Sequence, residues 1–384
     1  METASANAGI AAFISFYCTN GTAAAPGAFG PSRMRAEGLR CGNPFWKFRY
    51  DGDVAPLVSV VIDNHNYGRY LKQAIDSVLD QEDYHDRVEC IVVDDGSTDE
   101  SHHVIGSFGQ KVRSLFQPNQ GQATAFNNGF KLAQGEFVCL LDSDDYWHRD
   151  KLRRTMPRFD DPKVGVVQHL LRDVTATGRE LRHHMPRWPS DYGIDDFLEH
   201  RMHLTATSGL IFRKSILHQI LPIPKEIFYY LDDLLVVKAL FLSRVANIPE
   251  VLGFHRIHGM NYCAGGYRSP EKLAMDIEMR TIFDHEIQPW LSRHEKRLSR
   301  QYLALEDLEY FRRRILLYMY RGQRVRALIE WRDLVKKYWR TRLGLFRAAT
   351  CALALISPYL YLKFYEFYSD WGLLATLRTR VLPE

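Results

Sequence analysis

Residues 135–147 have the sequence GEFVCLLDSDDYW, an apolar run that ends in a cluster of acids. Asp142, Asp144 and Asp145 follow the run directly. Aspartate is a poor strand former and neighbouring anions repel each other, so a strand that ends this way needs a physical reason. The cluster can be a solvated turn, because Asp and Ser suit turns. It can also be a cation site that requires carboxylates on the rigid edge of a sheet.

The segments around this stretch alternate between strand-like and helix-like patterns. Residues 56–63, PLVSVVID, form a β-branched run typical of a buried strand, and YGRYLKQAIDSVLDQ then has apolar residues at helical spacing. VECIVVDD, VRSLFQ and FVCLLD indicate further strands, with the helical segments SHHVIGSFG and GQATAFNNGFKLAQG between them. This alternation predicts an α/β fold with a mostly parallel sheet flanked by helices.

Three of these strands end in polar or acidic residues: 63–66 (DNHN), 94–97 (DDGS) and 142–145 (DSDD). In parallel sheets, ligands bind beyond the carboxyl ends of the strands. One such end could be an ordinary turn. Three on the same edge predict a binding site.

The composition limits the classes of function. The chain has 384 residues, of which 46% are hydrophobic and 25% charged, so it is an ordinary globular sequence with length for about two domains. The formal net charge is only +4, and we expect no nucleic-acid partner, although basic residues concentrate late in the chain. The six cysteines show no CxxC pair and no His/Cys ligand spacing, which argues against a zinc finger or a disulfide scaffold.

The two ends of the chain differ in character. Residues 1–54 are expected to be a disordered leader, because the apolar piece AGIAAFISFYC suits neither a signal peptide nor a spanning helix. We therefore expect a cytoplasmic protein. After about residue 270 the pattern is helical, and the apolar segment AATCALALISPYLYLKFY is interrupted by Pro358. That segment could lie in a membrane interface, or it could be buried against the preceding domain.

The order VVDDGSTD, NQGQATAFNNG and LLDSDD resembles the family 2 glycosyltransferases, which are nucleotide-sugar-dependent enzymes of the GT-A fold. The resemblance is strong over residues 56–155 and weakens towards 265. It implies a GT-A domain over 55–265, with a nucleotide-sugar half at 55–155 and an acceptor half at 156–265. Residues 266–384 would then form a helical C-terminal region, which could be peripheral at the inner membrane face.

The resemblance assigns the metal motif to Asp142, Ser143 and Asp144. It implies that Asp144 binds Mn²⁺ or Mg²⁺ directly, while Asp142 touches the ribose or the metal. Oxygen ligands favour these hard cations. GFHRIHGMN is similar to the family's YRxHxxN ending, which makes His258 a further metal or diphosphate ligand. Arg256 could pair with Asp232 or with phosphate.

The resemblance also implies a set of donor-binding residues. At the end of the first strand, Asp63 and His65 stand where the family holds the nucleotide base. Asp94 and Asp95 form the acidic pair, and Asp95 could accept from the base or form a turn into Gly96-Ser97. The segment NQGQATAFNNG adds two further candidates, Asn119 and Gln122.

On the acceptor side, YYLDDLLVVKAL resembles the family's motif for the general base, with Leu231 in place of the preceding acid. Asp232 falls at the base position and Asp233 is the alternate. Either aspartate could instead cap the helix that follows. TSGLIFRKS resembles the segment that shapes the acceptor pocket.

Together these motifs predict an inverting, metal-dependent glycosyltransferase that moves a sugar from a UDP-linked donor to a glycan or lipid-linked acceptor hydroxyl in surface polysaccharide or glycoconjugate assembly. One alternative is a non-catalytic nucleotide- or sugar-binding scaffold on the same fold. A nucleotidyltransferase is a poorer match, because DNHNYGRYLK replaces the Gly-rich basic loop that such an enzyme needs after the first strand.

Overall fold

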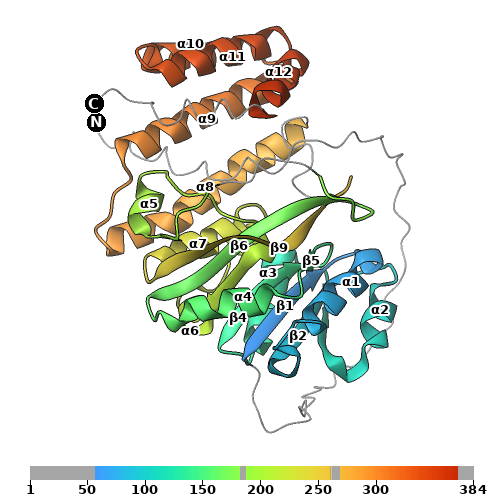
Figure 1. Cartoon of the computed structure of the whole chain (residues 1–384). Helices are drawn as coiled ribbons and strands as arrows, with labels where there is room; N and C mark the ends of the chain where they lie inside the picture. The colour runs from blue at the N-terminus through green and yellow to red at the C-terminus, as the bar shows by residue number, and fades with distance from the viewer. Residues whose placement is uncertain (1–56, 182–186, 260, 262–268, 371–384) are drawn as a thin grey trace.

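A nine-stranded sheet with helices on both faces carries a separate layer of helices at its C-terminal end (Figure 1). The structure is a computed structural model, and it describes residues 57–181, 187–259, 261 and 269–370. The strands are β1 Val58–Asn64, β2 Val88–Asp95, β3 Val112–Gln117, β4 Phe137–Asp142, β5 Tyr146–Trp147, β6 Val164–Thr175, β7 Asp191–Tyr192, β8 Leu210–Arg213 and β9 Arg244–Ile257. The helices are α1 Gly68–Leu79, α2 Ser101–Ser107, α3 Gln122–Leu132, α4 Lys151–Thr155, α5 Ile194–Leu198, α6 Lys214–Ile220, α7 Leu231–Leu240, α8 Pro270–Arg293, α9 Arg300–Tyr320, α10 Arg324–Tyr338, α11 Arg342–Ile356 and α12 Pro358–Asp370.

The sheet is parallel in its first half and mixed in its second. The strand order is β3-β2-β1-β4-β8-β6-β9-β5, with β7 paired to β9. The pairs among β1 to β4 are parallel, whereas β8 runs antiparallel to both β4 and β6. The α/β class predicted from the sequence is confirmed, and the predicted parallel pairing holds for β1 to β4, which include the three strands that carry the acidic motifs.

Residues of β1 alternate between two hydrophobic cores. Val61 packs with Phe126 of α3 on one face, while Val60 and Ile62 pack with α1 on the other. Burial on both faces explains why this strand is a continuous apolar run rather than an alternating one. On the α3 side, a β-carbon at Gly129 would lie 2.2 Å from Val61 Cγ1, so only glycine permits this close approach of helix and sheet.

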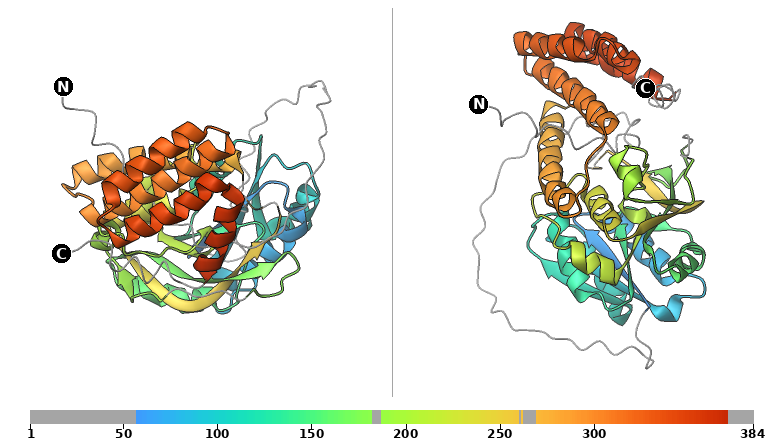
Figure 2. Two further views of the ribbon diagram at one scale, coloured as in Figure 1. Left: turned by 90° about the horizontal axis from the view of Figure 1, so that it is seen from above. Right: turned by 90° about the vertical axis from the view of Figure 1, so that its left-hand side faces the viewer.

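The C-terminal helices form their own layer. Helix α8 contacts α7 at the sheet and α9 beyond it, and α9 to α12 pack on one another around a third core (Figure 2). The apolar segment 348–365 falls in α11 and α12 and packs against α9, so it is not buried against the sheet as one expectation had it. Across the described part of the chain, no helix combines the length and apolarity that crossing a bilayer requires. The expected leader, 1–54, lies outside the described residues.

Candidate functional site

Two carboxylates lie side by side where β1 and β4 end. The two strands pair in register, so that Asp63 is the direct neighbour of Asp142. Gln122, the first residue of α3, donates from Nε2 to Oδ1 of Asp142 at 3.0 Å. Oδ1 of Asp63 is buried and finds no hydrogen-bond partner among the residues that the structure describes. A buried carboxylate oxygen without a donor is costly, so this position is suited to a positively charged ligand.

The pKa values of these carboxyl groups are displaced upwards. Burial, followed by the charge of Asp144, raises the pKa of Asp63 to about 7. Burial and then the charges of Asp63, Asp145, Asp144 and Asp232 raise the pKa of Asp142 well above its usual range. Both lost hydration and like charges favour the protonated form. A bound divalent cation would favour the ionised form instead.

Asp144 contacts the segment that follows β9. Its Oδ2 lies 2.9 Å from Nε2 of His258, and Asn261 donates from Nδ2 to the same oxygen at 3.3 Å. The His258 ring is buried and stacks on Tyr70 of α1, with ring centroids 5.3 Å apart. The structure therefore brings together the second aspartate of the predicted metal motif and the predicted histidine, which are 114 positions apart in the chain.

Asp145, in contrast, is held by the protein itself. Ser208 donates from its hydroxyl to Oδ2 at 2.6 Å, and the backbone N–H of Arg256 donates to Oδ1 at 2.8 Å. Burial nevertheless raises the pKa of Asp145 to about 6. With both oxygens bonded to the protein, this third acid of the cluster anchors the site rather than opening towards a ligand.

The side chain of Arg256 is also fully engaged. It donates to the carbonyl oxygen of Asp144 at 2.8 Å, to that of Ala176 at 3.0 Å and to Oε1 of Gln73 at 2.7 Å. The pairing with Asp232 considered from the sequence is not formed, because these three acceptors take the guanidinium. Arg256 instead locks the backbone of the acidic loop.

Asp94 fixes the turn after β2. It accepts from Nδ2 of Asn64 at 2.7 Å and from the backbone N–H of Ser97 at 2.9 Å. The turn into Gly96-Ser97 that the sequence offered for Asp95 is therefore made by Asp94.

Asp95 holds the loop that precedes α3. Its Oδ1 accepts from the backbone N–H of Gln120 at 2.8 Å and from Nε2 of Gln117 at 2.7 Å, and its Oδ2 accepts from the N–H of Gly121 at 2.7 Å. Gly121 has a φ of 87°, which glycine adopts without strain. A base that bonds Asp95 would have to share or displace these donors.

His65 lies next to this loop. Its Nδ1 is 2.8 Å from the carbonyl oxygen of Asp95, and its Nε2 is 3.1 Å from Nδ2 of Asn119. Three residues predicted to bind the nucleotide sugar, His65, Asp95 and Asn119, thus meet at the end of β2. The imidazole is partly exposed, so it is available to stack on a planar ligand.

The short turn Thr207–Gly209 contacts both the acidic residues 142–145 and the start of α7. Thr207 donates from its hydroxyl to Oδ2 of Asp232 at 3.4 Å. The next residue, Ser208, contacts both the carboxylate of Asp145 and the backbone N–H of Asp142. Burial raises the pKa of Asp232, which makes it a stronger proton acceptor. The predicted base is therefore coupled by one turn to the predicted metal motif.

The start of α7 has an unusual backbone. Tyr230 has a φ of 63°, a left-handed conformation that is uncommon outside glycine. Its hydroxyl donates to Asp276 of α8, which is also paired with Arg313 of α9 at 2.8 Å, and the guanidinium of Arg280 lies 4.8 Å from its ring centroid. The C-terminal helices hold this strained residue, which stands two positions before Asp232.

Two other predicted residues are buried. Ser143 is 2% exposed, between the two aspartates of the motif. Asp233 is 1% exposed, and its charge adds a smaller contribution to the burial and the Glu306 charge that raise the pKa of Tyr302 in α9. Asp233 thus acts on the helical layer, whereas Asp232 acts on the acidic edge.

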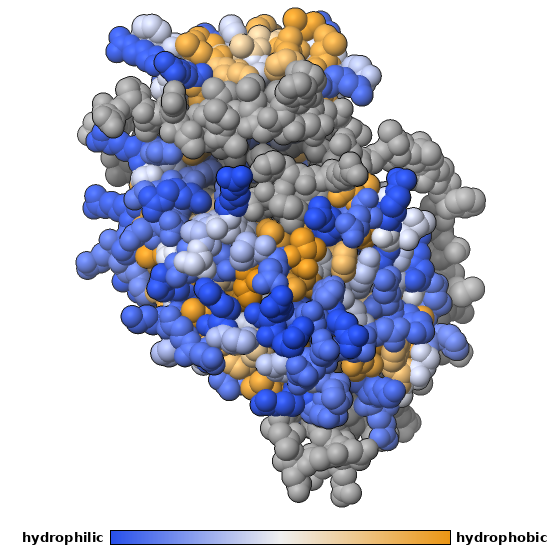
Figure 3. Space-filling model, viewed as in Figure 1, coloured by the Kyte–Doolittle hydropathy of each residue, from blue (hydrophilic) through white to orange (hydrophobic). Residues whose placement is uncertain are grey.

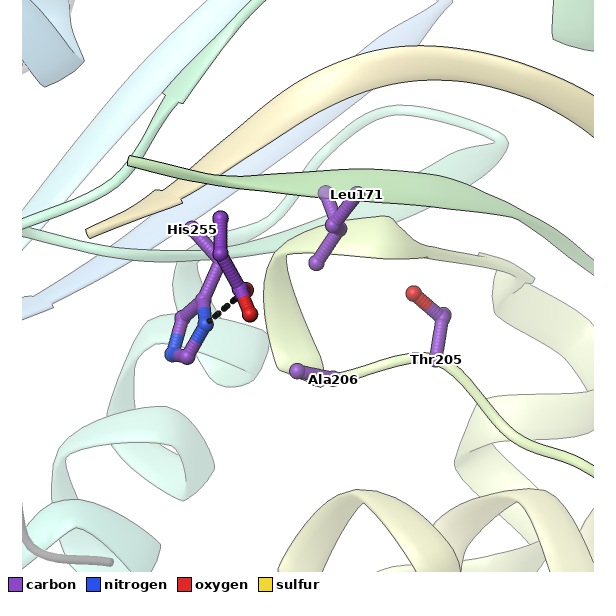
Figure 4. A pocket seen from close by; sticks show the side chains of 5 residues that line it. Leu171, Thr205, Ala206 and His255 are labelled. Atoms are coloured by element: carbon purple, nitrogen blue, oxygen red, sulfur yellow. Dashed lines mark hydrogen bonds and ion pairs between the residues drawn. The ribbon is translucent and has the colours of Figure 1, made fainter. Parts of the chain in front are cut away.

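A small pocket opens between β6, β9 and the segment before Thr207 (Figure 4). Its lining comprises Leu171, Asp173, Thr205, Ala206 and His255. Nδ1 of His255 is 2.9 Å from Oδ1 of Asp173. Burial alone would lower the pKa of His255, but the charges of Asp145 and Asp173 raise it to about 10. The neighbouring carboxylates of Asp145 and Asp173 therefore favour the protonated, cationic form of the His255 imidazole.

With this geometry established, comparison with known proteins identifies the family. The model described as glycosyl transferase family 2 matches residues 59–221. An uncharacterised glycosyltransferase of Nostoc sp. is 36% identical over 216 residues, or 53% of this chain and 66% of the relative. Residues 59–221 of this chain form a family 2 glycosyltransferase domain. The putative teichuronic acid biosynthesis glycosyltransferase TuaG of Bacillus subtilis is 37% identical to it over 105 residues, 26% of this chain and 41% of that protein. The chain thus spans less than two thirds of the length of these relatives.

Two solved structures are similar to this chain in fold, each at 19% sequence identity. S. aureus TarS 1–349 in complex with UDP-GlcNAc aligns with a TM-score of 0.49 over 74% of this chain and 91% of that chain. The mannosyltransferase PcManGT from Pyrobaculum calidifontis, in complex with GDP-Man and Mn²⁺, aligns with the same TM-score over 84% and 88%.

The residues at the ends of β1 and β4, together with His258, suit a divalent cation such as Mn²⁺ or Mg²⁺. Within the described ranges, no three His, Cys, Asp or Glu side chains surround one point as a complete metal cage. Asp144 and His258 provide one carboxylate and one imidazole in contact, and the charge of Asp144 also acts on Asp63. Mg²⁺ is commonly held by one or two protein ligands together with substrate phosphates, so an incomplete protein shell is the expected one.

The sequence did not single out several residues that build the site. Tyr70 appeared only as part of the helical spacing of α1, and Asp173 and His255 were not considered. GFHRIHGMN did contain a signal for His255, because that histidine stands where the family ending has tyrosine. Asp276 gave no signal, since nothing in a helical sequence indicates a partner 46 positions away.

Proposed function

We propose that this chain transfers a sugar, with inversion, from a nucleotide-sugar donor to an acceptor hydroxyl, and that the reaction depends on Mn²⁺ or Mg²⁺. The observation that carries the proposal is the link from the acidic loop to Asp232: Ser208 contacts Asp145 and the backbone N–H of Asp142, and its neighbour Thr207 donates to Asp232. A donor site and a proton acceptor on opposite sides of one turn are what a single displacement requires.

The donor is proposed to lie across the ends of β1, β2 and β4. His65 and Asp95 are positioned for the base, and Asn119 and Gln122 line the approach to Asp142. A UDP-linked donor is favoured by the family resemblance, in which this acidic pair holds uracil. Asp144 and His258 would hold the cation, which when bound neutralises the charge that develops on the diphosphate.

Asp232 is the proposed general base. It removes the proton from the acceptor hydroxyl as that oxygen attacks C1 of the sugar. The bond from C1 to the diphosphate oxygen breaks, and its electron pair leaves with the nucleoside diphosphate. The raised pKa of Asp232 helps it to accept this proton, while the hydroxyl of Thr207 orients the carboxylate. Asp233 remains the alternate base.

The acceptor is proposed to be a glycan or a lipid-linked saccharide used in surface polysaccharide or glycoconjugate assembly, at the cytoplasmic face of the membrane. The relative named for teichuronic acid biosynthesis supports this class.

The test is a panel of UDP-, GDP- and dTDP-sugars incubated with the full chain in Mn²⁺ or in EDTA, with nucleotide release and calorimetric affinity as readouts. We expect metal-dependent release from one donor, abolished in Asp144→Ala and retained in Asp86→Ala, a matched change at an exposed aspartate. Donor binding without release, even with a crude acceptor extract, would favour the non-catalytic scaffold. No binding to any donor would overturn the assignment of the site.

A further inference from the structure

The helical layer exposes an apolar face on the side away from its core. Cys351, Ala354 and Tyr361 are completely buried within the layer. On the outer side of α10, α11 and α12, large apolar side chains are 49% to 72% exposed. They are Val325, Leu328, Trp339, Leu345, Ile356, Tyr359 and Leu360. We call these seven residues the outer face; Figure 3 shows apolar side chains gathered over this end of the molecule, with hydrophilic ones beside them.

The spacing of these residues makes the face continuous. On α11, Leu345, Ala349 and Ile356 are exposed at intervals of four and seven positions, which places them on one side of a helix. Helix α10 packs against α11, and its exposed Val325 and Leu328 extend the face. A contiguous exposed apolar area on the surface of a protein indicates an interaction site.

The charge around the face is net positive. Residues 324–370, from the start of α10 to the end of α12, contain nine Lys and Arg residues and four acids, Glu330, Asp333, Glu366 and Asp370. Glu330 is paired with Arg314, and Asp333 lies 2.9 Å from the guanidinium of its neighbour Arg332. Exposed basic side chains, among them Lys336, Arg340 and Arg342, remain beside the apolar residues.

We propose that the outer face binds the surface of a bilayer that contains anionic lipids, with its apolar side chains in the interface and its basic side chains at the head groups. A second copy of the chain would bring two like-charged rims together, which disfavours self-association. Trp339 and Tyr359 are the amphipathic aromatics that prefer the interface. An amphipathic, basic surface without a spanning helix is typical of peripheral membrane proteins.

The proposal is tested by sedimenting the full chain with vesicles of phosphatidylcholine alone or of equal parts phosphatidylcholine and phosphatidylglycerol. We expect binding only to the anionic vesicles, and weaker binding as salt is raised. Leu328→Gln with Ile356→Gln should lower the vesicle partition coefficient roughly tenfold or more. Lys336→Glu with Arg340→Glu should have an effect of similar size.

Matched controls are Leu303→Gln, an exposed leucine on α9, and Lys111→Glu with Lys225→Glu, two exposed lysines outside the layer. These should bind vesicles like the parent chain, and thermal unfolding checks that each variant folds. No binding to anionic vesicles, or equal loss in the controls, would overturn the proposal. A dimer in solution that Leu328→Gln with Ile356→Gln dissolves would assign the face to a second copy instead. Nucleotide release is measured in the same variants, so failure here is separable from failure of the proposed reaction.

Discussion

Buried acids occur in two regions of this molecule, and the two regions treat them differently. In the helical layer, Glu309 lies 2.5 Å from Arg312 and also pairs with Arg347. Asp276 pairs with Arg313 in the same way. Each of these carboxylates has an arginine partner within ion-pair distance.

At the sheet edge, the balance is the opposite. Among the described residues, no lysine or arginine side chain forms an ion pair with Asp63, Asp142 or Asp144. Their mutual repulsion and burial raise the pKa values of Asp63 and Asp142. Acids in the helical layer have arginine partners, whereas those at the sheet edge have none among the described residues. This contrast supports the proposal that a cation binds at the sheet edge.

The largest expected effect concerns the proposed base. Asp232→Asn should lower kcat roughly 10²–10⁴-fold, because the proton of the acceptor hydroxyl loses its destination. Donor affinity should be unchanged, since the substitution leaves Asp144 and His258 in place. Steady-state kinetics and calorimetry separate the two quantities. Asp233→Asn is the control and should alter stability more than kcat; the reverse result would make Asp233 the base.

The next effect concerns stability and uses the balanced region. Arg312→Met should lower the free energy of unfolding by about 3–5 kcal/mol, because it leaves Glu309 buried with fewer partners. Urea denaturation of the full chain measures this. A loss below about 1 kcal/mol would match a solvated pair and would remove the contrast between the two regions.

The pH dependence of stability follows from the unbalanced region. Asp63 has a pKa of about 7 in the folded chain against its usual 3.8, so the native state binds more protons between these values. Stability is therefore present below pH 4 and lost as pH rises to 7, by roughly 2–4 kcal/mol. Asp145, at about 6, acts in the same direction.

His255, at about 10 against its usual 6.5, extends the same fall in stability to higher pH. Unfolding by urea between pH 5 and pH 8 without metal should show the decline, and Mn²⁺ should reduce it. A rise in stability over this range would contradict the assignment of raised pKa values.

A smaller effect is expected where the two regions meet. Tyr230→Phe removes the hydroxyl that bonds Asp276 and so loosens the start of α7, two positions before Asp232. We expect kcat to fall roughly tenfold with little change in donor affinity. Tyr229→Phe, at the neighbouring position, serves as the control. Equal losses in both variants would indicate a general packing effect rather than positioning of the base.

Much of this arrangement could be predicted from sequence, for a definite reason. Strand ends in a parallel sheet share one edge, so Asp63, Asp95 and Asp142 could be brought together from local patterns alone. The family resemblance added His258, which periodicity could not place. The domain boundaries expected near residues 155 and 265 stay predictions.

What could not be predicted depends on long-range contacts. The engagement of Arg256 by Gln73 joins residues 183 positions apart, and the link from Tyr230 to Asp276 crosses between two layers. The choice between Asp232 and Asp233 as the residue facing the edge likewise depends on how α7 is rotated. No local pattern contains that rotation, because both neighbours fit a helix start equally well.

The most direct test of the contrast is the unfolding free energy of Asp142→Asn in urea at pH 8 without metal. Asparagine keeps the size of the side chain and removes one of the repelling charges. The account predicts that this variant is more stable than the parent chain by roughly 1–2 kcal/mol, although it loses nucleotide release. A variant less stable than the parent would show that Asp142 is already balanced within the protein, and it would contradict the claim that this edge is built for a cation and a nucleotide sugar.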